Sequence, residues 1–203
     1  MTRPTPRLVL AAYMQGVFPM AHPEEEDRIY WYAPDPRAIL PLDDFHISRR
    51  LRQTVRKAPF EITVNQAFAD VIRACAEPRE DSGLTWISDE LADLFIELHR
   101  MGFAHSIEAW EDDRLVGGLY GVAIGGFFAG ESMFHRATDA SKVCLVHLVQ
   151  RLNDRGFALL DIQFLTDHLT RFGAIEIPRV EYEERLQKAL TIPARFADDP
   201  PFS

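Results

Sequence analysis

The stretch AHSIEAWEDDRLVGGLYGVAIGGFFAGESMFH, residues 104–135, determines the fold. Three mostly apolar segments, AHSIEAW, LVGGLYGVAIGG and FFAGESMFH, follow one another in it. Only the charged turn EDDR and a glycine pair separate them, and connections this short join neighbouring antiparallel strands. The stretch therefore predicts three consecutive strands in a meander, the centre of a sheet.

The sequence after the meander predicts a helix followed by another strand. SKVCLVHLVQRLNDRG, residues 141–156, carries leucines at helical spacing and ends at a glycine, which is a common helix terminator. FALLDIQF, residues 157–164, is a mostly apolar strand. The segment TDHLTRFG and a helix over EYEERLQKAL, residues 181–190, then close the chain.

The sequence before the meander alternates between helical and extended patterns. Helices are predicted at residues 46–57, 65–76 and 88–102, and a strand at 59–65. The acidic segment 77–85 is predicted to be a loop. Residues 8–20 begin as a short helix that Gly16 and Pro19 would stop, and residues 21–37 read as loop and turns around an aromatic cluster, Tyr30, Trp31 and Tyr32.

These elements predict the α+β class. We expect a small N-terminal domain, residues 1–36, and a second domain, residues 37–203, with a mixed, largely antiparallel sheet flanked by helices. The order of meander, helix and strand suits a GNAT-like architecture. Because a fold hosts many activities, that match says little about function.

Composition narrows the possible classes of protein. The chain has 203 residues, 47% of them hydrophobic and 26% charged, as in an ordinary globular protein. No apolar run reaches the roughly 18 residues of a membrane span, and the N-terminus lacks a signal-peptide pattern, so we expect a cytoplasmic protein. The net charge of −9 argues against a surface that binds nucleic acid indiscriminately.

Three polar residues stand out in the apolar strands. Glu131 lies among aromatic and apolar neighbours at the expected end of a central strand. Asp161 and Gln163 are two residues apart, so they face the same side of their strand. A solvated outer face would also explain this pair. The apolar sequence on both sides favours an interior, functional face instead.

Several motifs, in order, resemble one bacterial family. They are YMQGVFPM, WYAPDPRAIL, HISRRLR, TWIS, HSIEAW, LVGGLYGVAIGGFFAGESMF and DIQFLTDH, which run from Tyr13 to His168. Together they look like the leucyl/phenylalanyl-tRNA–protein transferase family, over a region that reaches Pro178. GESMF combined with WYAPDPRA is its most specific part.

The resemblance implies an activity and a set of site residues. Such an enzyme moves Leu, Phe or Met from its tRNA to the N-terminal amine of proteins that begin with Arg or Lys, which marks them for degradation. Glu131, Asp161 and Gln163 match the family's catalytic group. The residues that match its aminoacyl pocket are Trp86, Leu119, Phe128, Gly130, Met133, Leu145, Leu148, Leu152 and Leu160.

The chemistry of these side chains suggests their roles. Gln163 is too weakly basic to take a proton, so we assign it to positioning the amine or the oxyanion. Glu131 is the better candidate to bind the incoming ammonium and accept its proton. Asp161 would hold Gln163 or relay a proton. From spacing alone, Leu145, Leu148 and Leu152 would be ordinary core residues; only the resemblance makes them a pocket wall.

One predicted helix is strongly basic. Residues 46–57 contain no acidic side chain, and their cations are candidates to bind tRNA phosphates, although a solvated helix face would look the same. We add two residues near the expected 3′ end of the tRNA. The full set is Arg49, Arg50, Arg52, Arg56, Lys57, Arg136 and Lys142.

The sequence predicts no cofactor and no metal. Cys75 and Cys144 are far apart, and Cys144 with His147 has no second pair at ligand spacing. A GNAT acetyltransferase is the nearest alternative, but HRATDASKVC, where such an enzyme has a glycine-rich loop for the pyrophosphate of coenzyme A, contains no glycine. A non-catalytic RNA- or peptide-binding module is the other alternative. Nothing in the sequence demands more than a monomer.

Overall fold

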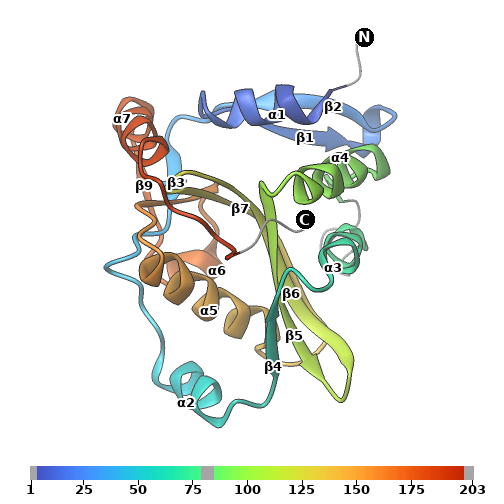
Figure 1. Cartoon of the computed structure of the whole chain (residues 1–203), viewed down its shortest axis with the longest axis vertical. Coiled ribbons are helices and arrows are strands. Elements are labelled where there is room, and N and C mark those ends of the chain that lie inside the picture. The colour runs from blue at the N-terminus through green and yellow to red at the C-terminus, as the bar shows by residue number, and fades with distance from the viewer. Residues whose placement is uncertain (1–3, 79–84, 199–203) are drawn as a thin grey trace.

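The computed structural model describes residues 4–78 and 85–198, and in them a mixed seven-stranded sheet organises the chain (Figure 1). The strands follow the order β4-β5-β6-β7-β8-β3-β9. β7 and β8 pair in parallel and the other neighbours are antiparallel. The predicted α+β class, with a mixed and largely antiparallel sheet, is confirmed.

The predicted meander forms the centre of the sheet. It consists of β5 (Ala104–Glu111), β6 (Arg114–Ile124) and β7 (Phe127–His135). Asp112 and Asp113 join β5 to β6, both with positive φ (48° and 60°). Two such residues are the mark of the tight hairpin turn whose twist matches that of the strands.

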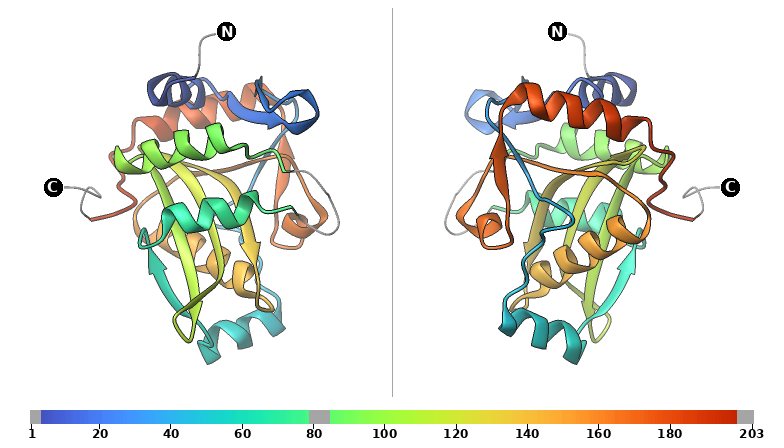
Figure 2. Two further views of the ribbon diagram at one scale, coloured as in Figure 1. Left: turned by 90° about the vertical axis from the view of Figure 1, so that its right-hand side faces the viewer. Right: turned by 90° about the vertical axis from the view of Figure 1, so that its left-hand side faces the viewer.

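Helices cover both faces of the sheet (Figure 2). α5 (Ala140–Asp154) packs on β5 and β6 from one side, while α3 (Phe68–Ala76) and α4 (Asp89–Arg100) cover the other. Because side chains alternate along a strand, Leu119 of β6 joins the core under α5 and Tyr120 joins the core under α3 and α4.

The remaining strands and helices extend the sheet and its margins. β8 (Leu159–Gln163) follows α5, which completes the predicted order of meander, helix and strand. The others are α2 (Arg49–Lys57), β4 (Glu61–Val64), α6 (Asp167–Thr170), β9 (Ile175–Ile177) and α7 (Arg179–Leu190). α2 begins three residues later than predicted, because the Ser48 side chain accepts a hydrogen bond from the Leu51 amide and caps the helix.

The N-terminal segment differs from its prediction. After α1 (Pro6–Tyr13), the strands β1 (Phe18–His22) and β2 (Arg28–Tyr32) form a separate two-stranded sheet, with the short 3-10 helix Pro23–Glu25 between them. The prediction of loop and turns here was wrong. Aromatic rings pair across the hairpin, such as Phe18 with Tyr32 at 6.0 Å between centroids, and they stabilise strands that alternation alone did not reveal.

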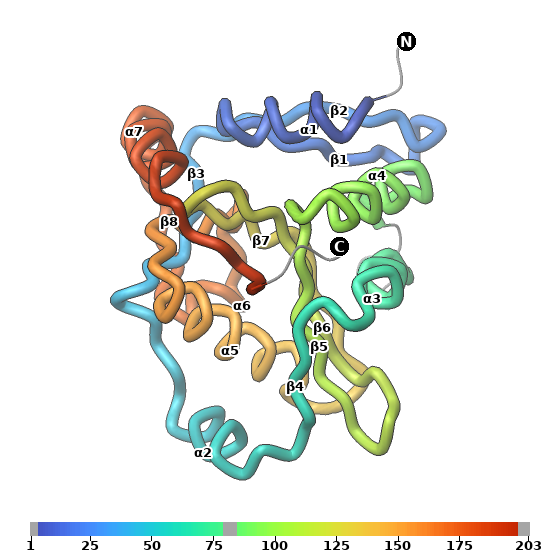
Figure 3. Tube along the Cα trace, viewed as in Figure 1, coloured from blue at the N-terminus to red at the C-terminus, as the bar shows by residue number. Residues whose placement is uncertain are grey.

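Two further points concern this end of the chain. β3 (Arg37–Ile39), of which only Arg37 had been read as loop, joins the main sheet between β8 and β9. α1 and the hairpin lie across one end of the molecule, between α4 and α7, as the tube trace shows (Figure 3). The division at residues 36 and 37 stays a prediction. Residues 79–84 of the predicted acidic loop are outside the described residues.

Across the described ranges, none of the helices combines the length and the apolar character that a membrane crossing requires.

Candidate active site

Glu131 occupies an irregularity in the middle of β7, not the end of a strand as the sequence suggested. Tyr120 of β6 faces Ser132, and the next residue, Gly121, faces Gly130, so Glu131 is an extra residue without a partner. This is a β-bulge, a device that redirects a side chain. Gly121 permits it, because a Cβ there would lie 2.2 Å from the Ala129 carbonyl oxygen.

The parallel strands β7 and β8 bring Glu131 and Gln163 together. Their pairing runs from Phe127 and Leu159 to Ala129 and Asp161, and the two residues follow just beyond it. There the Gln163 side-chain amide donates a hydrogen bond of 3.2 Å to Glu131 Oε1. The two halves of the predicted catalytic group are therefore in contact.

Asp161 is completely buried, and both of its carboxylate oxygens accept hydrogen bonds. Arg37 grips it with two hydrogen bonds, Nε to Oδ1 at 2.8 Å and Nη2 to Oδ2 at 2.6 Å. The Tyr182 hydroxyl donates to Oδ2 at 2.9 Å, and the Gln163 backbone amide donates to Oδ1 at 3.0 Å. Gln163 has a positive φ of 60°, which this last bond stabilises. Of its two suggested roles, the geometry favours holding Gln163.

Arg37 is a site residue that sequence reasoning missed. It is 1% exposed and lies between the rings of Phe18 and Tyr182, at 4.7 and 4.6 Å from their centroids. Its Nη1 donates to the Gly16 carbonyl at 3.0 Å. Its position inside WYAPDPRAIL was the only available signal. Arg37, itself in β3 of the sheet, thus contacts the N-terminal segment through Gly16, α7 through Tyr182, and the carboxylate of Asp161.

Tyr13 of α1 is the second missed residue. Its buried hydroxyl donates a hydrogen bond of 2.7 Å to Glu131 Oε1. Glu131 keeps some surface open to the cavity beside it, yet burial of the carboxyl group raises its pKa to about 8. The Tyr13 hydrogen bond opposes this rise in pKa and the charge of Asp161 adds to it. Such a carboxyl group can exchange a proton near neutral pH.

A cavity of about 980 Å³ opens beside this pair. Its polar wall includes Glu131 and Gln163, and its apolar wall comes from β6, β7, β8 and α5. Most of the predicted pocket residues line it, namely Trp86, Leu119, Gly130, Met133, Leu145, Leu148 and Leu160. Phe128 and Leu152 lie behind this wall in the core under α5. A mainly apolar slot thus ends at a carboxyl group and an amide.

Comparison with known families shows to which family this chain belongs. Residues 39–187 match the leucyl/phenylalanyl-tRNA protein transferase family, and residues 3–35 match the N-terminal domain of the same family. The chain belongs to the leucyl/phenylalanyl-tRNA protein transferase family. Its predicted membership is confirmed, and the acetyltransferase alternative is not favoured.

Two relatives illustrate how complete the match is. A leucyl/phenylalanyl-tRNA–protein transferase from Gloeobacter violaceus is 55% identical over 192 residues, 95% of this chain and 97% of the relative. One from Herpetosiphon aurantiacus is 53% identical and covers 96% and 98%. Among solved structures, a ribosomal-protein-alanine N-acetyltransferase from Brucella melitensis is 17% identical, covers 50% of this chain and 76% of its own, and has a TM-score of 0.35, on which we base no argument.

In this member of the transferase family, the predicted tRNA-binding residues form two groups. Arg49, Arg50, Arg52, Arg56 and Lys57 are all exposed on α2. Arg136 and Lys142 line the cavity, where Arg136 pairs with Glu77 at 2.6 Å and Lys142 with Asp139 at 2.5 Å. Arg50 of α2 also approaches Asp139, at 3.9 Å. The basic helix is therefore connected to the rim of the cavity.

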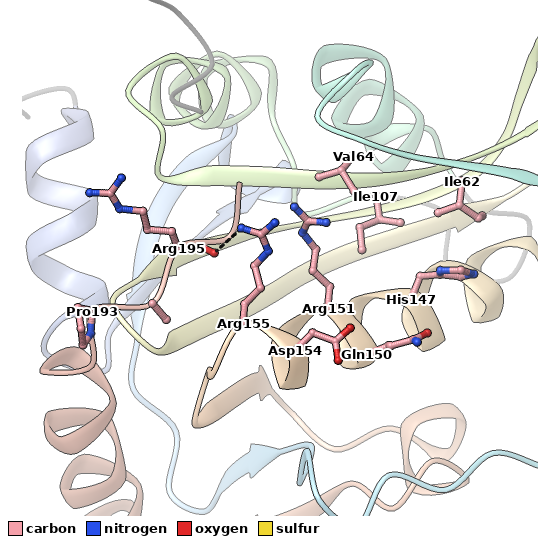
Figure 4. A pocket seen from close by; sticks show the side chains of 11 residues that line it. Ile62, Val64, Ile107, His147, Gln150, Arg151, Asp154, Arg155, Pro193 and Arg195 are labelled. Carbon is pink, nitrogen blue, oxygen red and sulfur yellow. Dashed lines mark hydrogen bonds between the residues drawn. The ribbon is translucent and has the colours of Figure 1, made fainter. Parts of the chain in front are cut away.

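A second cavity, of about 920 Å³, lies on a different face of α5 (Figure 4). It contains none of the predicted site residues. Arg151 of α5 and Arg155, directly after the end of α5, extend into it, and Arg155 donates to the Arg195 carbonyl oxygen at 3.4 Å. Both arginines also contact the C-terminal segment, through Phe196 and Asp198. These bonds attach the segment to α5.

Within residues 4–78 and 85–198, no three His, Cys, Asp or Glu side chains are grouped so that they could hold a metal ion. Cys75 and Cys144 are buried in the two cores on opposite faces of the sheet.

Proposed function

We propose that this protein transfers Leu, Phe or Met from aminoacyl-tRNA to the N-terminal amine of proteins that begin with Arg or Lys, which marks them for degradation. The relatives are named as transferases that use leucyl- or phenylalanyl-tRNA and protein. The observation that carries the proposal is the hydrogen-bonded pair of Glu131 and Gln163 at one end of a mainly apolar cavity.

The reaction is the aminolysis of an ester. The acceptor nitrogen attacks the aminoacyl carbonyl, a C–N bond forms, and the C–O bond to the terminal ribose breaks. The nitrogen loses a proton and the leaving ribose oxygen gains one. A free α-amine has a pKa of about 7.7–8.0. The pKa of about 8 for Glu131 matches it, so the ionised carboxylate can accept the proton that the bound ammonium loses when it becomes the neutral amine, and can release that proton to water after the transfer.

Gln163 and Asp161 support this step without exchanging protons. Gln163 presents an amide that can donate to the oxyanion or accept from the amine. Asp161 fixes the backbone of Gln163 while Arg37 balances its charge. Much of the acceleration comes from aligning the two substrates, which is worth roughly 7–11 kcal/mol in favourable cases.

The apolar wall supports the choice of donor. Leu119, Leu145 and Leu148 offer no hydrogen-bond partner, so a polar aminoacyl side chain would lose its water without compensation, at a cost of about 1–3 kcal/mol. Met133 can adapt its shape to Leu, Phe or Met. In this proposal, Phe128 and Leu152 shape the pocket from behind.

The basic groups support contact with the tRNA backbone. The cations of α2 would hold phosphates of the acceptor stem, and Arg136 and Lys142 would hold those near the 3′ end. We further propose that residues 1–36 and 37–203 are the two domains, that the enzyme acts as a monomer, and that it works in the cytoplasm, where charged tRNA is made.

One assay tests the proposal. The protein is incubated with labelled Phe-tRNA and a peptide that begins with Arg, and the peptide's N-terminus is examined for label. Transfer supports the proposal, while acetylation from acetyl-CoA without transfer would replace it by the acetyltransferase activity. Within an active enzyme, near-normal transfer by Glu131→Gln together with loss of transfer in Gln163→Glu would reverse the roles of the two residues.

A further inference from the structure

Tyr120 has a buried hydroxyl group that the fold does not use. The residue lies on β6, is 0% exposed and packs edge-on against Phe68 and Phe95, at 5.9 and 5.4 Å between centroids. Among the described residues, its hydroxyl is the buried side-chain polar atom that lacks a hydrogen-bond partner. Such a group destabilises a folded protein, whereas Phe would fill the same space without this penalty.

The position of Tyr120 connects it to the catalytic cavity. It lines the cavity that Glu131 and Gln163 line. It also faces Ser132 across the sheet, directly beside the bulge that redirects Glu131. The negative charge of Glu131 acts on the Tyr120 hydroxyl and, after burial, is the main cause that raises its pKa. Tyr120 therefore stays protonated and can act as a hydrogen-bond donor.

Two donors reach the same oxygen of the Glu131 carboxyl group. Tyr13 and Gln163 both donate to Oε1, and neither donates to Oε2. The charged and titratable groups that act on Glu131 are Tyr13 from α1, Arg37 from β3 and Asp161 from β8. Arg37 is engaged by Asp161. Oε2 of the ionised carboxylate can accept a hydrogen bond, and the hydroxyl of Tyr120, which lines the same cavity, is a donor without a partner among the described residues.

We propose that Tyr120 is a positioning residue for Glu131, whose hydroxyl donates a hydrogen bond to the carboxylate when Glu131 ionises. Its catalytic consequence rests on the proposed function: the bond would hold the carboxylate in place while it binds the acceptor ammonium. Both oxygens of the ionised form can only accept hydrogen bonds, so ionisation creates a demand that the Tyr120 hydroxyl can meet.

The first experiment needs no transferase activity. The ionisation of Glu131 is followed by carbon NMR of labelled Glu carboxyl groups in the unmodified protein and in Tyr120→Phe, with Glu131→Gln to assign the signal. We expect the pKa of Glu131 to rise in Tyr120→Phe, with about a tenfold smaller ionisation constant, since a donor to the charged form is lost. An unchanged pKa would overturn the proposal. Thermal unfolding should show Tyr120→Phe to be at least as stable as the parent.

The second experiment measures the catalytic consequence. At pH 7.5, Tyr120→Phe should lower kcat/KM for the acceptor peptide about tenfold, move the acidic limb of the pH profile upward, and leave KM for Phe-tRNA unchanged. In a Glu131→Gln background the same change should have no further effect. A persistent effect there would mean that Tyr120 acts on the substrate directly and would refute the proposal.

A matched control tests whether the effects of Tyr120→Phe are specific to Tyr120 or follow from the loss of any tyrosine hydroxyl. Tyr30 donates to Glu25 in the hairpin and does not line the cavity. Tyr30→Phe should leave both the pKa of Glu131 and the transfer rate unchanged; a matching shift in this variant would contradict the assignment to Tyr120. If the unmodified protein transfers nothing, the proposed function fails, while the titration of Glu131 still decides the role of Tyr120.

Discussion

Replacing Glu131 by Gln should stabilise the folded protein at alkaline pH while it abolishes efficient transfer. Burial raises the pKa of Glu131 from an ordinary 4.5 to about 8. Between these two values the folded protein keeps a proton that the unfolded chain has released. The free energy of unfolding therefore falls as the pH rises through this window. The neutral Gln side chain has the same shape and can still accept hydrogen bonds from Tyr13 and Gln163.

The size of the effect follows from the same pKa values. One pKa unit is 1.36 kcal/mol, so the complete window corresponds to at most about 5 kcal/mol. Because part of Glu131 faces the cavity, where water can solvate the ionised form, we expect about 2–3 kcal/mol at pH 8. For a chain of this length that corresponds to roughly 4–12 °C in Tm.

The assay is urea unfolding of both proteins at several values of pH. Their stabilities should coincide near pH 4.5, and the Glu131→Gln variant should become progressively more stable up to pH 8. The difference in the free energy of unfolding between the two proteins is taken at each pH. The contributions of the histidines and of every other group that titrates in both proteins cancel in this difference. A difference that stays constant with pH, or a variant that is less stable at pH 8, would refute the assignment of a raised pKa to Glu131.

Three further predictions concern the ion pair of Arg37 and Asp161, the aminoacyl pocket and the basic helix α2. Arg37→Met leaves a buried carboxylate without its partner and should cost about 3–5 kcal/mol in urea unfolding; a loss below 1 kcal/mol would contradict the role of this ion pair. Leu148→Ala enlarges the cavity and should change the ratio of kcat/KM for Phe-tRNA over Leu-tRNA several-fold, whereas Val149→Ala, buried on the same helix but outside the cavity lining, should destabilise the fold and leave the ratio unchanged. Equal changes of this ratio in both variants would contradict the assignment of Leu148 to the pocket wall. Arg52→Glu with Arg56→Glu should weaken tRNA binding and reduce its salt dependence by about 0.7–0.9 in log–log slope per lost phosphate contact; an unchanged slope would exclude α2 from the tRNA interface.

Local patterns were sufficient to predict most of the sheet. The meander of β5, β6 and β7 follows from extended segments separated by very short turns, and α5 from its apolar spacing and terminal glycine. The N-terminal hairpin was missed because its strands are held by aromatic contacts and carry no clear alternation. Cross-strand pairing of this kind depends on a partner that a single segment does not reveal.

The sequence alone determined which residues are chemically unusual, and the tertiary structure decided what they can do. Glu131, Asp161 and Gln163 stood out because polar groups in apolar strands require a reason. The contacts of Arg37 and Tyr13 could not be predicted from the sequence, since the two residues lie 124 and 118 positions from the carboxylates they bind. Contacts at such separations leave no periodic pattern in the chain. Only the folded structure brings these groups together, and their burial and hydrogen bonds then set the pKa of Glu131.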